Sequence, residues 1–384
     1  MSGLSRGSIA IVGAAESELG QVAPGTSPVD LMAQATFRAL ADCGLGLADV
    51  DGVFTAASQL RMPTLSLCDY LGLRPRYQDG TGIGGSSFMS HVAHAMAAIE
   101  HGLCEVALIA YGSTQRSVSR AAASPREYNP YETPYRPFLP ASAYALAASR
   151  HMHEFGTTRE QLAEVAVAAR QWALLNPVAW EKAPLSIQQV LEARMVSYPL
   201  SVRDCCLVTD GGGAVILTSA ARARDLKRPP AYVLGVGECL SHASISGMPD
   251  LTTTGAAVSG AQAYAMAGLA AQDVDAALLY DAFTINTILF LEDLGFCPKG
   301  EGGRFVAGGA IAPGGRLAVN TAGGGLSYCH PGMYGLLLLI EAARQLRGEC
   351  GARQVANCEV AIAHGNGGVL SSQVTVLLGS EAAL

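Results

Sequence analysis

Asn320-Thr-Ala-Gly-Gly-Gly-Leu-Ser-Tyr-Cys-His-Pro-Gly332 brings together three consecutive glycines, a tyrosine and a His-Pro pair. Glycine has no side chain, so a ligand can approach the backbone of such a loop closely. Pro331 suits the first turn of a helix, and the apolar pattern over 334–346 predicts that a helix follows. His330 would then lie beside a helix N-terminus, where free N–H groups favour negative charge. This segment is therefore our candidate for an oxyanion-stabilising site.

The composition is that of one large domain or two packed halves with few charges. The chain has 384 residues, of which 50% are hydrophobic and 15% charged, and its formal net charge is −7. The low charge content predicts a homo-oligomer that covers an apolar face. No basic run is present, which argues against nucleic acid and anionic membranes as partners. Apolar runs such as 336–340 are too short to span a bilayer.

Cysteine usage points to a reducing compartment. The 10 cysteines show neither CxxC nor Cys/His metal-ligand spacing. The N-terminus runs directly into a strand-like segment at 8–13, without the pattern of a signal peptide. We therefore expect free thiols, no metal site and a cytoplasmic location.

Strand and helix patterns alternate along the chain. Apolar runs predict strands over 9–13, 50–55, 105–112, 214–217, 231–236, 276–280 and 373–378. Periodicity and capping residues predict helices over 27–43, 89–101, 141–155, 159–175, 256–267, 284–294 and 334–346. This alternation favours an α/β protein with mainly parallel sheets in layers. The segment 113–140 is rich in Ser, Arg, Tyr and Pro, and we predict an insertion loop that covers a site.

Three segments of the first half recur in the same order in the second half. The run 104–112 recurs at 358–365, 81–88 recurs at 321–328, and 46–54 recurs at 269–279. Three collinear matches indicate two halves of similar fold, whose glycine loops face a shared cleft. We predict an N-terminal half at 1–220, with a loop insertion at about 113–200, and a C-terminal half at 221–384.

The repeated halves and the loop at 320–332 together resemble the thiolase superfamily. The resemblance covers nearly the whole chain and is most specific at 320–332, Tyr280-Asp-Ala-Phe283 and His364-Gly-Asn-Gly-Gly368. The most similar branch contains the sterol-carrier-protein-x thiolases and the lipid-transfer-protein aldolases of steroid degradation. The resemblance implies a five-layered αβαβα sandwich, usually dimeric, that binds acyl-CoA.

Departures from the thiolase pattern fall on the reactive residues. The nucleophilic cysteine of thiolases corresponds to Gly85 here, and the second cysteine corresponds to His364. The asparagine of the Asn-Glu-Ala-Phe loop corresponds to Tyr280, whereas the histidine of the His-Pro motif is retained as His330. An acyl-enzyme mechanism needs an activated nucleophile and a second acid/base group, and both cysteines are absent.

These substitutions favour a reaction through a thioester enolate without a covalent intermediate. Retro-aldol cleavage of a β-hydroxyacyl-CoA fits, because it needs only proton transfer and enolate stabilisation. In the steroid aldolases, two tyrosines at positions matching Tyr280 and Tyr328 are implicated in catalysis, so the resemblance implies acid/base roles for both. Tyrosine has a pKa of about 10 and needs a cation or helix dipole nearby to act as a base. His330 is the expected oxyanion donor, with His364 supporting it.

The expected substrate is a CoA thioester, with no tightly bound cofactor. The residues expected to bind it are Gly85, Ser86, Ser87, Gly324, Gly325, Asn366 and Gly367. We expect a homodimer. Relatives in this branch often work with a small DUF35 protein, an OB-fold with a zinc ribbon, and 113–140 is one place where such a partner could bind.

Two other functions stay open at this point. An acyltransferase of the acetyl-CoA acetyltransferase type could use Ser86, Ser87 or Cys329 as its nucleophile, although serine needs a neighbouring base. A non-catalytic subunit could bind acyl-CoA or lipid without turnover. Purely structural roles are the alternative at Tyr280, Tyr328 and His364.

Overall fold

The protein is described by a computed structural model that covers residues 3–118 and 129–384. The strands are β1 (Ile9–Glu16), β2 (Gly52–Thr55), β3 (Tyr77–Asp79), β4 (Val106–Ser113), β5 (Met195–Ser197), β6 (Leu200–Ser201), β7 (Gly211–Ser219), β8 (Ala231–Leu240), β9 (Ala276–Leu279), β10 (Ala318–Val319), β11 (Val360–Gly367) and β12 (Ser372–Gly379). The helices are α1 (Pro28–Cys43), α2 (Pro63–Leu71), α3 (Ser87–Glu100), α5 (Ala141–Phe155), α6 (Arg159–Leu174), α7 (Ile187–Leu191), α8 (Ala220–Ala223), α9 (Ala256–Ala267), α10 (Thr284–Asp293), α11 (Gly302–Val306) and α12 (Gly335–Leu346). In this described part of the chain, no helix is long and apolar enough to cross a membrane.

Most strands join one mixed sheet whose two flanks repeat each other. Its order is β10-β9-β11-β12-β8-β1-β7-β4-β2-β3. On one flank, β1–β7 and β7–β4 are antiparallel, and β4–β2 and β2–β3 are parallel. On the other, β8–β12 and β12–β11 are antiparallel, and β11–β9 and β9–β10 are parallel. The predicted repeat of two halves is thus confirmed.

The expectation of mainly parallel sheets is wrong, because β7 pairs antiparallel with both β1 and β4, and β12 pairs antiparallel with both β8 and β11. The β11–β12 pair shows the reason most simply. A short turn after Gly367 leads straight into β12, and such a hairpin connection can only be antiparallel. The turn uses left-handed backbone at Gly368 and Leu370, with φ of 63° at each.

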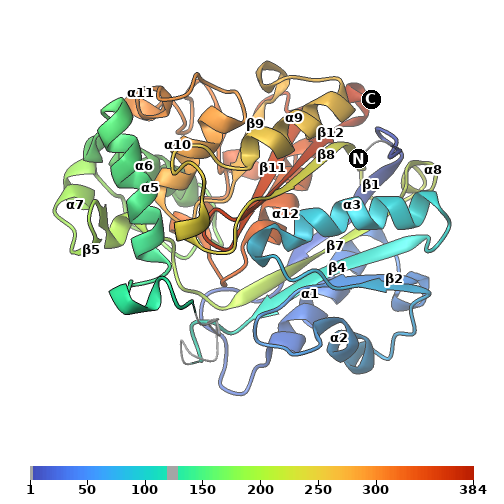
Figure 1. Ribbon diagram of the computed structural model, residues 1–384. Coiled ribbons are helices and arrows are strands. Elements are labelled where there is room, and N and C mark those ends of the chain that lie inside the picture. Colours follow the sequence, from blue (N-terminus) through green and yellow to red (C-terminus); the bar gives the residue numbers. More distant parts are fainter. Residues whose placement is uncertain (1–2, 119–128) are drawn as a thin grey trace.

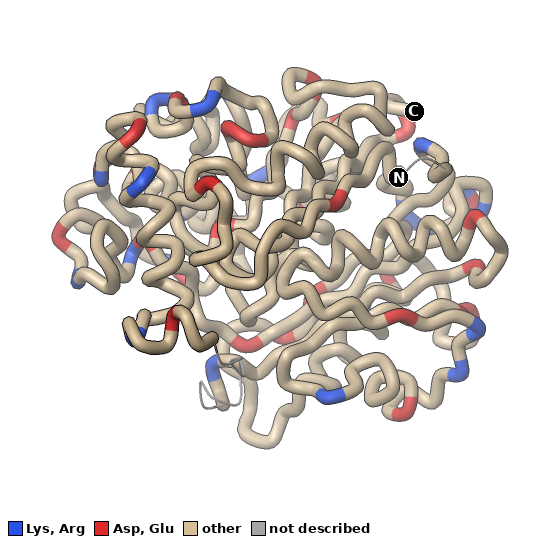
Figure 2. The backbone as a smooth tube through the Cα atoms, viewed as in Figure 1, with Lys and Arg blue, Asp and Glu red and all other residues tan. Residues whose placement is uncertain are grey.

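Helices divide the molecule into five layers (Figure 1). Between the two flanks of the sheet lie α3, which contacts β2, β4 and β12, and α12, which contacts β1, β7 and β11. On the outside, α1 covers β1, β7 and β4, and α9 covers β8 and β12. This is the αβαβα sandwich that the resemblance implied. Charged residues mark the helices and loops far more often than the strands (Figure 2), in agreement with a sheet covered on both faces.

The three sequence repeats occupy equivalent places in the two halves. Residues 104–112 and 358–365 form β4 and β11, and residues 46–54 and 269–279 lead into β2 and β9. Residues 81–88 and 321–328 contain the turns that precede α3 and α12. Both glycine loops therefore lead to the central helix layer. The division of the chain at residue 220 stays a prediction.

The inserted segment forms one end of the molecule, where α6 contacts α7 and α10 (Figure 1). The helices predicted over 141–155 and 159–175 are confirmed as α5 and α6. Thr158 begins α6 with a capping box that includes Gln161. The loop predicted over 113–140 is described only in part, since 119–128 lie outside the described residues, and its role in covering a site stays a prediction.

Candidate active site

Tyr280 directly follows β9 and is buried. Its hydroxyl lies 3.1 Å from Nε2 of His330 and 3.1 Å from the carbonyl oxygen of Gly332. The same hydroxyl oxygen accepts the N–H of Tyr334 at 3.1 Å. A tyrosine hydroxyl has a single proton, so it donates either to His330 or to Gly332. The structure therefore brings Tyr280 and His330 into direct contact.

His330 is fixed by its backbone and leaves one ring nitrogen unpartnered. Its N–H donates to Oγ1 of Thr209 at 3.0 Å, and its carbonyl accepts the N–H of Thr209 at 3.2 Å. Burial lowers the pKa of the imidazole to about 4, so the ring is neutral near pH 7. Among the described residues, Nδ1 has no hydrogen-bond partner. When Tyr280 donates to Nε2, the ring proton is on Nδ1, which is then a free donor.

The helix predicted over 334–346 is confirmed as α12 (Gly335–Leu346), but Pro331 lies before its first turn. Gly332 has a left-handed φ of 97°, which interrupts the helical path. The carbonyl of Pro331 accepts the hydroxyl of Tyr111 at 2.5 Å and takes no part in a helix. The ring of His330 nevertheless stacks on Tyr334, the N-cap residue of α12, at a centroid distance of 6.0 Å, so His330 lies close to that helix N-terminus as expected.

Tyr280 fills the space beside Gly85, the position that corresponds to the thiolase nucleophile. A Cβ atom at Gly85 would lie 2.1 Å from Cε2 of Tyr280 and 2.8 Å from the carbonyl oxygen of Asn366. Both distances are far below van der Waals contact. A side chain at position 85 and the ring of Tyr280 therefore exclude each other on this backbone. Gly85, expected to bind substrate, contacts the tyrosine ring.

The hydroxyls of Ser86 and Ser87 are engaged close to their own turn. Oγ of Ser86 donates to the carbonyl of Ile83 at 2.9 Å and lies 2.8 Å from Oγ of Ser372. Oγ of Ser87 donates to the carbonyl of Gly84 at 2.7 Å. A serine nucleophile needs a base that takes its proton, and a peptide carbonyl does not serve as one. The structure gives both serines a turn-stabilising role, which differs from the substrate contact we expected.

The second glycine loop wraps around the carboxylate of Asp281. The N–H of Gly325 donates to Oδ1 at 2.6 Å, and the N–H of Leu326 donates to Oδ2 at 3.3 Å. A Cβ at Gly324, which has a left-handed φ of 62°, would lie 2.0 Å from Oδ2. Glycine is therefore required at 324 by the carboxylate. The N–H of Gly325, expected to face substrate, is already bound by Asp281.

Asp281 is a titratable group that the sequence interpretation missed. Burial raises the pKa of its carboxyl group to about 7, although the N–H bonds of Gly325 and Leu326 oppose this shift. The Cβ position of Gly325 lies 3.0 Å from Cδ2 of His330 and 3.2 Å from Oδ1 of Asp281, so both side chains border the same glycine. The available signal was an acidic residue immediately after Tyr280.

The hydroxyl of Tyr328 is held away from the Tyr280–His330 pair. It donates to Oε1 of Glu16 at 2.7 Å, and Arg344 forms an ion pair with the same carboxylate at 2.5 Å. Burial and the nearby Glu16 raise the pKa of Tyr328 well above its ordinary value, and burial does the same for Tyr280. Both tyrosines are therefore protonated near pH 7, and neither is a base by itself.

His364 is fully buried within the sheet. Its Nδ1 lies 2.9 Å from Oγ1 of Thr375, and its Nε2 lies 2.9 Å from Oε1 of Gln373. The ring packs edge-on against Phe290 at a centroid distance of 4.5 Å. Burial lowers the pKa of His364 to about 4. Both ring nitrogens are thus bonded within the protein, and the direct support of His330 that we expected is not present.

Asn366 and Gly367 pack against neighbouring elements. Nδ2 of Asn366 donates to the hydroxyl of Tyr144 at 2.9 Å. A Cβ at Gly367 would lie 1.7 Å from the carbonyl oxygen of Ile83, so this glycine lets the first glycine turn approach β11. Neither residue presents a free polar group of the kind expected for substrate binding.

Cys329 is a buried thiol without activation. Burial raises its pKa well above the ordinary value, and Glu16 adds to the shift. Because the thiolate is the reactive form, this environment disfavours a nucleophile. In the described part of the chain, no group of three or more His, Cys, Asp and Glu side chains could hold a metal ion.

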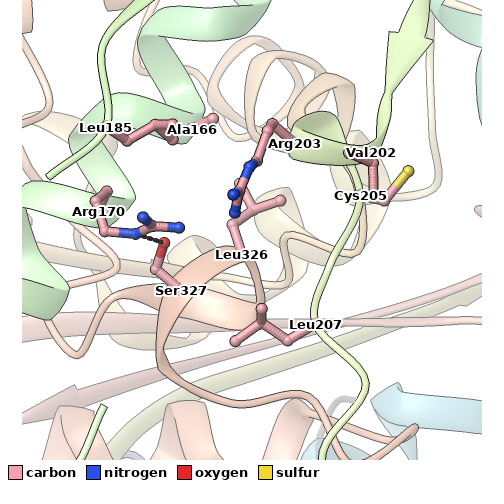
Figure 3. A pocket seen from close by; sticks show the side chains of 9 residues that line it. All are labelled: Ala166, Arg170, Leu185, Val202, Arg203, Cys205, Leu207, Leu326 and Ser327. Carbon is pink, nitrogen blue, oxygen red and sulfur yellow. Dashed lines mark hydrogen bonds between the residues drawn. The ribbon is translucent and has the colours of Figure 1, made fainter. Parts of the chain in front are cut away.

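Two adjoining hollows lie beside the second glycine loop. The smaller, of about 30 Å³, is lined by Leu326, Ser327 and two arginines (Figure 3). Nε of Arg170 donates to Oγ of Ser327 at 3.0 Å, and Arg203 lies across the hollow. The larger, of about 480 Å³, shares Arg170 and Arg203 and is also lined by Arg194, Glu181 and Glu192. Glu181 pairs with Arg170 at 3.3 Å and with Arg203 at 3.8 Å, so the rim that leads to the loop carries both signs of charge.

The chain is similar in sequence and in fold to several known proteins. Residues 237–380 match the family model described as "Thiolase C-terminal domain-like". The chain is 35% identical to the 17-hydroxy-3-oxo-4-pregnene-20-carboxyl-CoA lyase of Mycobacterium tuberculosis, over 89% of this chain and 92% of the relative. It is 33% identical to an acetyl-CoA acetyltransferase of Methanothermobacter thermautotrophicus, over 94% and 96%. A solved Ltp2-ChsH2(DUF35) aldolase aligns with a TM-score of 0.89 and 31% identity, over 99% of this chain and 100% of that chain.

Proposed function

The chain belongs to the thiolase superfamily, in the branch that contains the steroid side-chain aldolases, and from this premise we propose that it cleaves a β-hydroxyacyl-CoA by a retro-aldol reaction. The observation that carries the proposal is the ring of Tyr280, which fills the space beside Gly85. A site without a nucleophile cannot form an acyl-enzyme. A thioester enolate is then the intermediate that the remaining groups can stabilise.

A retro-aldol reaction releases one proton and takes one up. The β-hydroxyl loses its proton, the electron pair of the Cα–Cβ bond passes into the thioester as an enolate, and a carbonyl fragment departs. Cα then gains a proton. Tyr280 can take the hydroxyl proton while it passes its own to Nε2 of His330, 3.1 Å away. The same route in reverse returns the proton to Cα, so the site ends as it began.

His330 links proton uptake to charge stabilisation. Burial keeps the ring neutral before the reaction and holds the pKa of Tyr280 too high for it to act alone. Once the proton arrives on Nε2, the ring is a cation with an Nδ1–H that no described protein group binds. Positive charge thus develops as the enolate oxygen becomes negative. Such matched charge development is the strongest kind of transition-state stabilisation.

We propose that the phosphates of CoA bind at the arginines on the rim of the two hollows. Arg170, Arg194 and Arg203 line the larger hollow, and guanidinium groups pair with phosphate through two parallel hydrogen bonds. Arg170 and Arg203 also pair with Glu181, so Arg194 is the arginine of this set without that competitor. The smaller hollow continues from there to Leu326 and Ser327 (Figure 3). A thioester chain that starts at this rim would reach the loop that leads to the catalytic pair.

We further propose a steroid side-chain thioester as the acyl group. The name of the mycobacterial relative describes a hydroxyl at C17, β to the thioester carbon attached at C20. Cleavage between C17 and C20 would give a 17-ketosteroid and propionyl-CoA. The solved aldolase is named together with a DUF35 protein, and we propose a homologous partner beside residues 129–140, in an assembly built on a homodimer.

The test is release of propionyl-CoA from 17-hydroxy-3-oxo-4-pregnene-20-carboxyl-CoA. The full chain is assayed alone and after co-expression with a DUF35 protein. Product in either sample supports the lyase. Saturable binding of the thioester without product in both samples would contradict it and assign a non-catalytic acyl-CoA-binding role.

An acyltransferase is the second candidate, because one relative of similar identity carries that name. Only this activity requires a covalent acyl group on the protein. Intact-protein mass spectrometry after incubation with acetyl-CoA separates the two. We expect no added mass, whereas acetylation of Ser86, Ser87 or Cys329 would favour the transferase.

A further inference from the structure

Asn286 carries a buried carboxamide that the protein leaves unpartnered. It lies in the first turn of α10, and its side chain is fully buried. Among the described residues, neither its Oδ1 nor its Nδ2 has a hydrogen-bond partner. An unpaired buried amide lowers stability, and such groups are rare in folded proteins. A residue of this kind therefore points to a ligand that satisfies it.

Asn286 and Tyr144 meet at Phe283, whose carbonyl accepts the N–H of Asn286 at 3.0 Å. Burial raises the pKa of Tyr144 to about 12, and the nearby amide of Asn286, too poorly oriented for a regular hydrogen bond, opposes this shift. The ring of Tyr144 stacks on Phe283 with a centroid distance of 4.4 Å and an interplanar angle of 27°. Asn366, which binds the Tyr144 hydroxyl, also has its carbonyl oxygen 2.8 Å from the Cβ position of Gly85, next to the ring of Tyr280, so the two tyrosines border the same region.

A directed chain of hydrogen bonds holds the Tyr144 hydroxyl. Nδ2 of Asn366 donates to it at 2.9 Å, and Nε2 of Gln373 donates to Oδ1 of Asn366 at 2.8 Å. Oε1 of Gln373 can only accept, so His364, 2.9 Å away, carries its proton on Nε2. Tyr144 is left as a donor, facing the carbonyl of Gly368 at 3.1 Å. His364, Gln373 and Asn366 are thus positioning residues for this hydroxyl.

We propose that Asn286 and Tyr144 bind the β-oxygen of the substrate and select thioesters that carry a hydroxyl there. This inference rests on the proposed retro-aldol function. Nδ2 of Asn286 supplies a donor without a partner among the described residues, and the O–H of Tyr144 supplies a second when it turns from the carbonyl of Gly368 to the ligand. A β-oxygen can accept both as hydroxyl, as developing alkoxide and as departing carbonyl. The hydroxyl proton can face Oδ1 of Asn286 before it passes to Tyr280.

Two groups that have no partner among the described residues then match the two oxygens of the substrate. Nδ1 of His330 serves the thioester oxygen, and the amide of Asn286 serves the β-oxygen. A site that hydrogen-bonds a substrate hydroxyl strongly rejects the analogue that lacks it, because its buried polar groups are then left unpaired. The pair Asn286 and Tyr144 thereby explains how a thiolase fold can prefer a hydroxylated thioester.

The first test measures this preference by equilibrium binding. The ligands are 17-hydroxy-3-oxo-4-pregnene-20-carboxyl-CoA and its 17-deoxy counterpart, bound to the full chain with Tyr280→Phe to slow turnover. We expect the hydroxylated thioester to bind about 10- to 100-fold more tightly. Adding Asn286→Leu should bring the ratio close to one without changing the affinity for the deoxy thioester, and Tyr144→Phe should lower the ratio in the same direction.

An unchanged ratio in Asn286→Leu, or no preference or no binding in the parent, would overturn the proposal. Propionyl-CoA release by the unmodified chain is scored separately. Release with an unchanged ratio contradicts this inference alone, whereas absence of release contradicts the lyase itself. Failure of the two proposals is therefore distinguishable.

The second test uses stability, because a structural residue and a ligand-binding residue differ there. Asn286→Leu removes an unpaired buried amide at similar volume and should raise Tm by about 2 °C. Tyr232→Phe is the matched control, since Tyr232 is buried on β8 and its hydroxyl also has no partner among the described residues. It should leave the binding ratio unchanged. A lower Tm for Asn286→Leu would assign a structural role and overturn the proposal.

Discussion

The glycine turn before α3 and the glycine turn before α12 come from the same repeat but have different roles. In the first, Gly85 lies against the ring of Tyr280, and Ser87 bonds within the turn. In the second, the matching glycine, Gly325, binds Asp281 through its N–H, and the chain continues to His330. In the proposed reaction, the first turn thus leaves room for the ring of Tyr280, and the second half supplies the reacting groups. The difference arises in the side chains that each turn meets, since the backbone pattern is shared.

Tyr280→Phe should have the largest effect, because it removes the proton that links substrate to His330 while the ring still covers Gly85. We expect kcat to fall about 10³-fold, as for loss of a general acid–base, in an assay of propionyl-CoA release. Tyr328→Phe is the control from the same loop, and its loss should be much smaller, since that hydroxyl is bound to Glu16. A larger loss for Tyr328→Phe would transfer the acid–base role to that residue.

Gly85→Cys tests whether the ring of Tyr280 leaves space for a nucleophilic side chain at position 85. The new Cβ would meet the ring of Tyr280, so we expect a loss of about 1–3 kcal/mol in the free energy of unfolding, measured in urea. Adding Tyr280→Ala removes the ring and should recover part of the loss, which a double-mutant cycle would detect as coupling. Additive effects would show that position 85 and the ring do not compete.

The pH dependence of kcat/KM tests the role of the second glycine turn, which binds the carboxylate of Asp281. The carboxyl of Asp281 is ionised above and protonated below about pH 7, and protonation removes an acceptor from the N–H groups of Gly325 and Leu326. We expect kcat/KM to fall as pH decreases through about 7, whereas His330, with a pKa of about 4, adds nothing in this range. Asp281→Asn should flatten the profile. If the acidic decline persists in that variant, another group controls it.

Ser87→Ala and Ser327→Ala should have the smallest effects. These two serines occupy equivalent positions in the repeat, so the pair compares the two turns directly. Loss of the turn bond in Ser87→Ala should cost about 1 kcal/mol of stability with kcat nearly unchanged. Ser327→Ala loses the contact with Arg170, so we expect a higher KM for the CoA thioester. The measurements are urea unfolding and steady-state kinetics on both variants. A large loss of kcat in Ser87→Ala would return a catalytic role to the first turn.

Local sequence patterns were sufficient to predict the helices, the strands and the repeat of two similar halves. The helices over 141–155 and 256–267 were predicted with their observed bounds, because apolar periodicity and terminal glycines are local signals. The repeats identified two similar halves because each copy keeps its strand and its glycine turn. Sheet direction was not predicted, since it depends on where the chain returns after each strand.

The site was predicted less completely than the fold, because the hydrogen-bond partners of its side chains lie far away in the sequence. Motifs identified Tyr280 and His330, but Tyr328 bonds to Glu16, which lies 312 positions away, and no local pattern contains that pairing. Asn286 was missed because an asparagine in an apolar helix gives no sign that both its polar atoms are unpartnered. Side-chain partners follow from tertiary packing, which periodicity does not encode.

The ion pair between Glu16 and Arg344 has a consequence for biosynthesis. The ribosome completes Glu16 at the end of β1 early, and its cation in α12 emerges only when nearly the whole polypeptide has been made. Until then Glu16 lacks the cation that offsets its burial in the folded protein, and it also lacks the hydroxyl of Tyr328, which likewise comes late in the chain. Nascent chains that stop before α12 therefore cannot complete this wall of the site, so premature termination should give no partially active product.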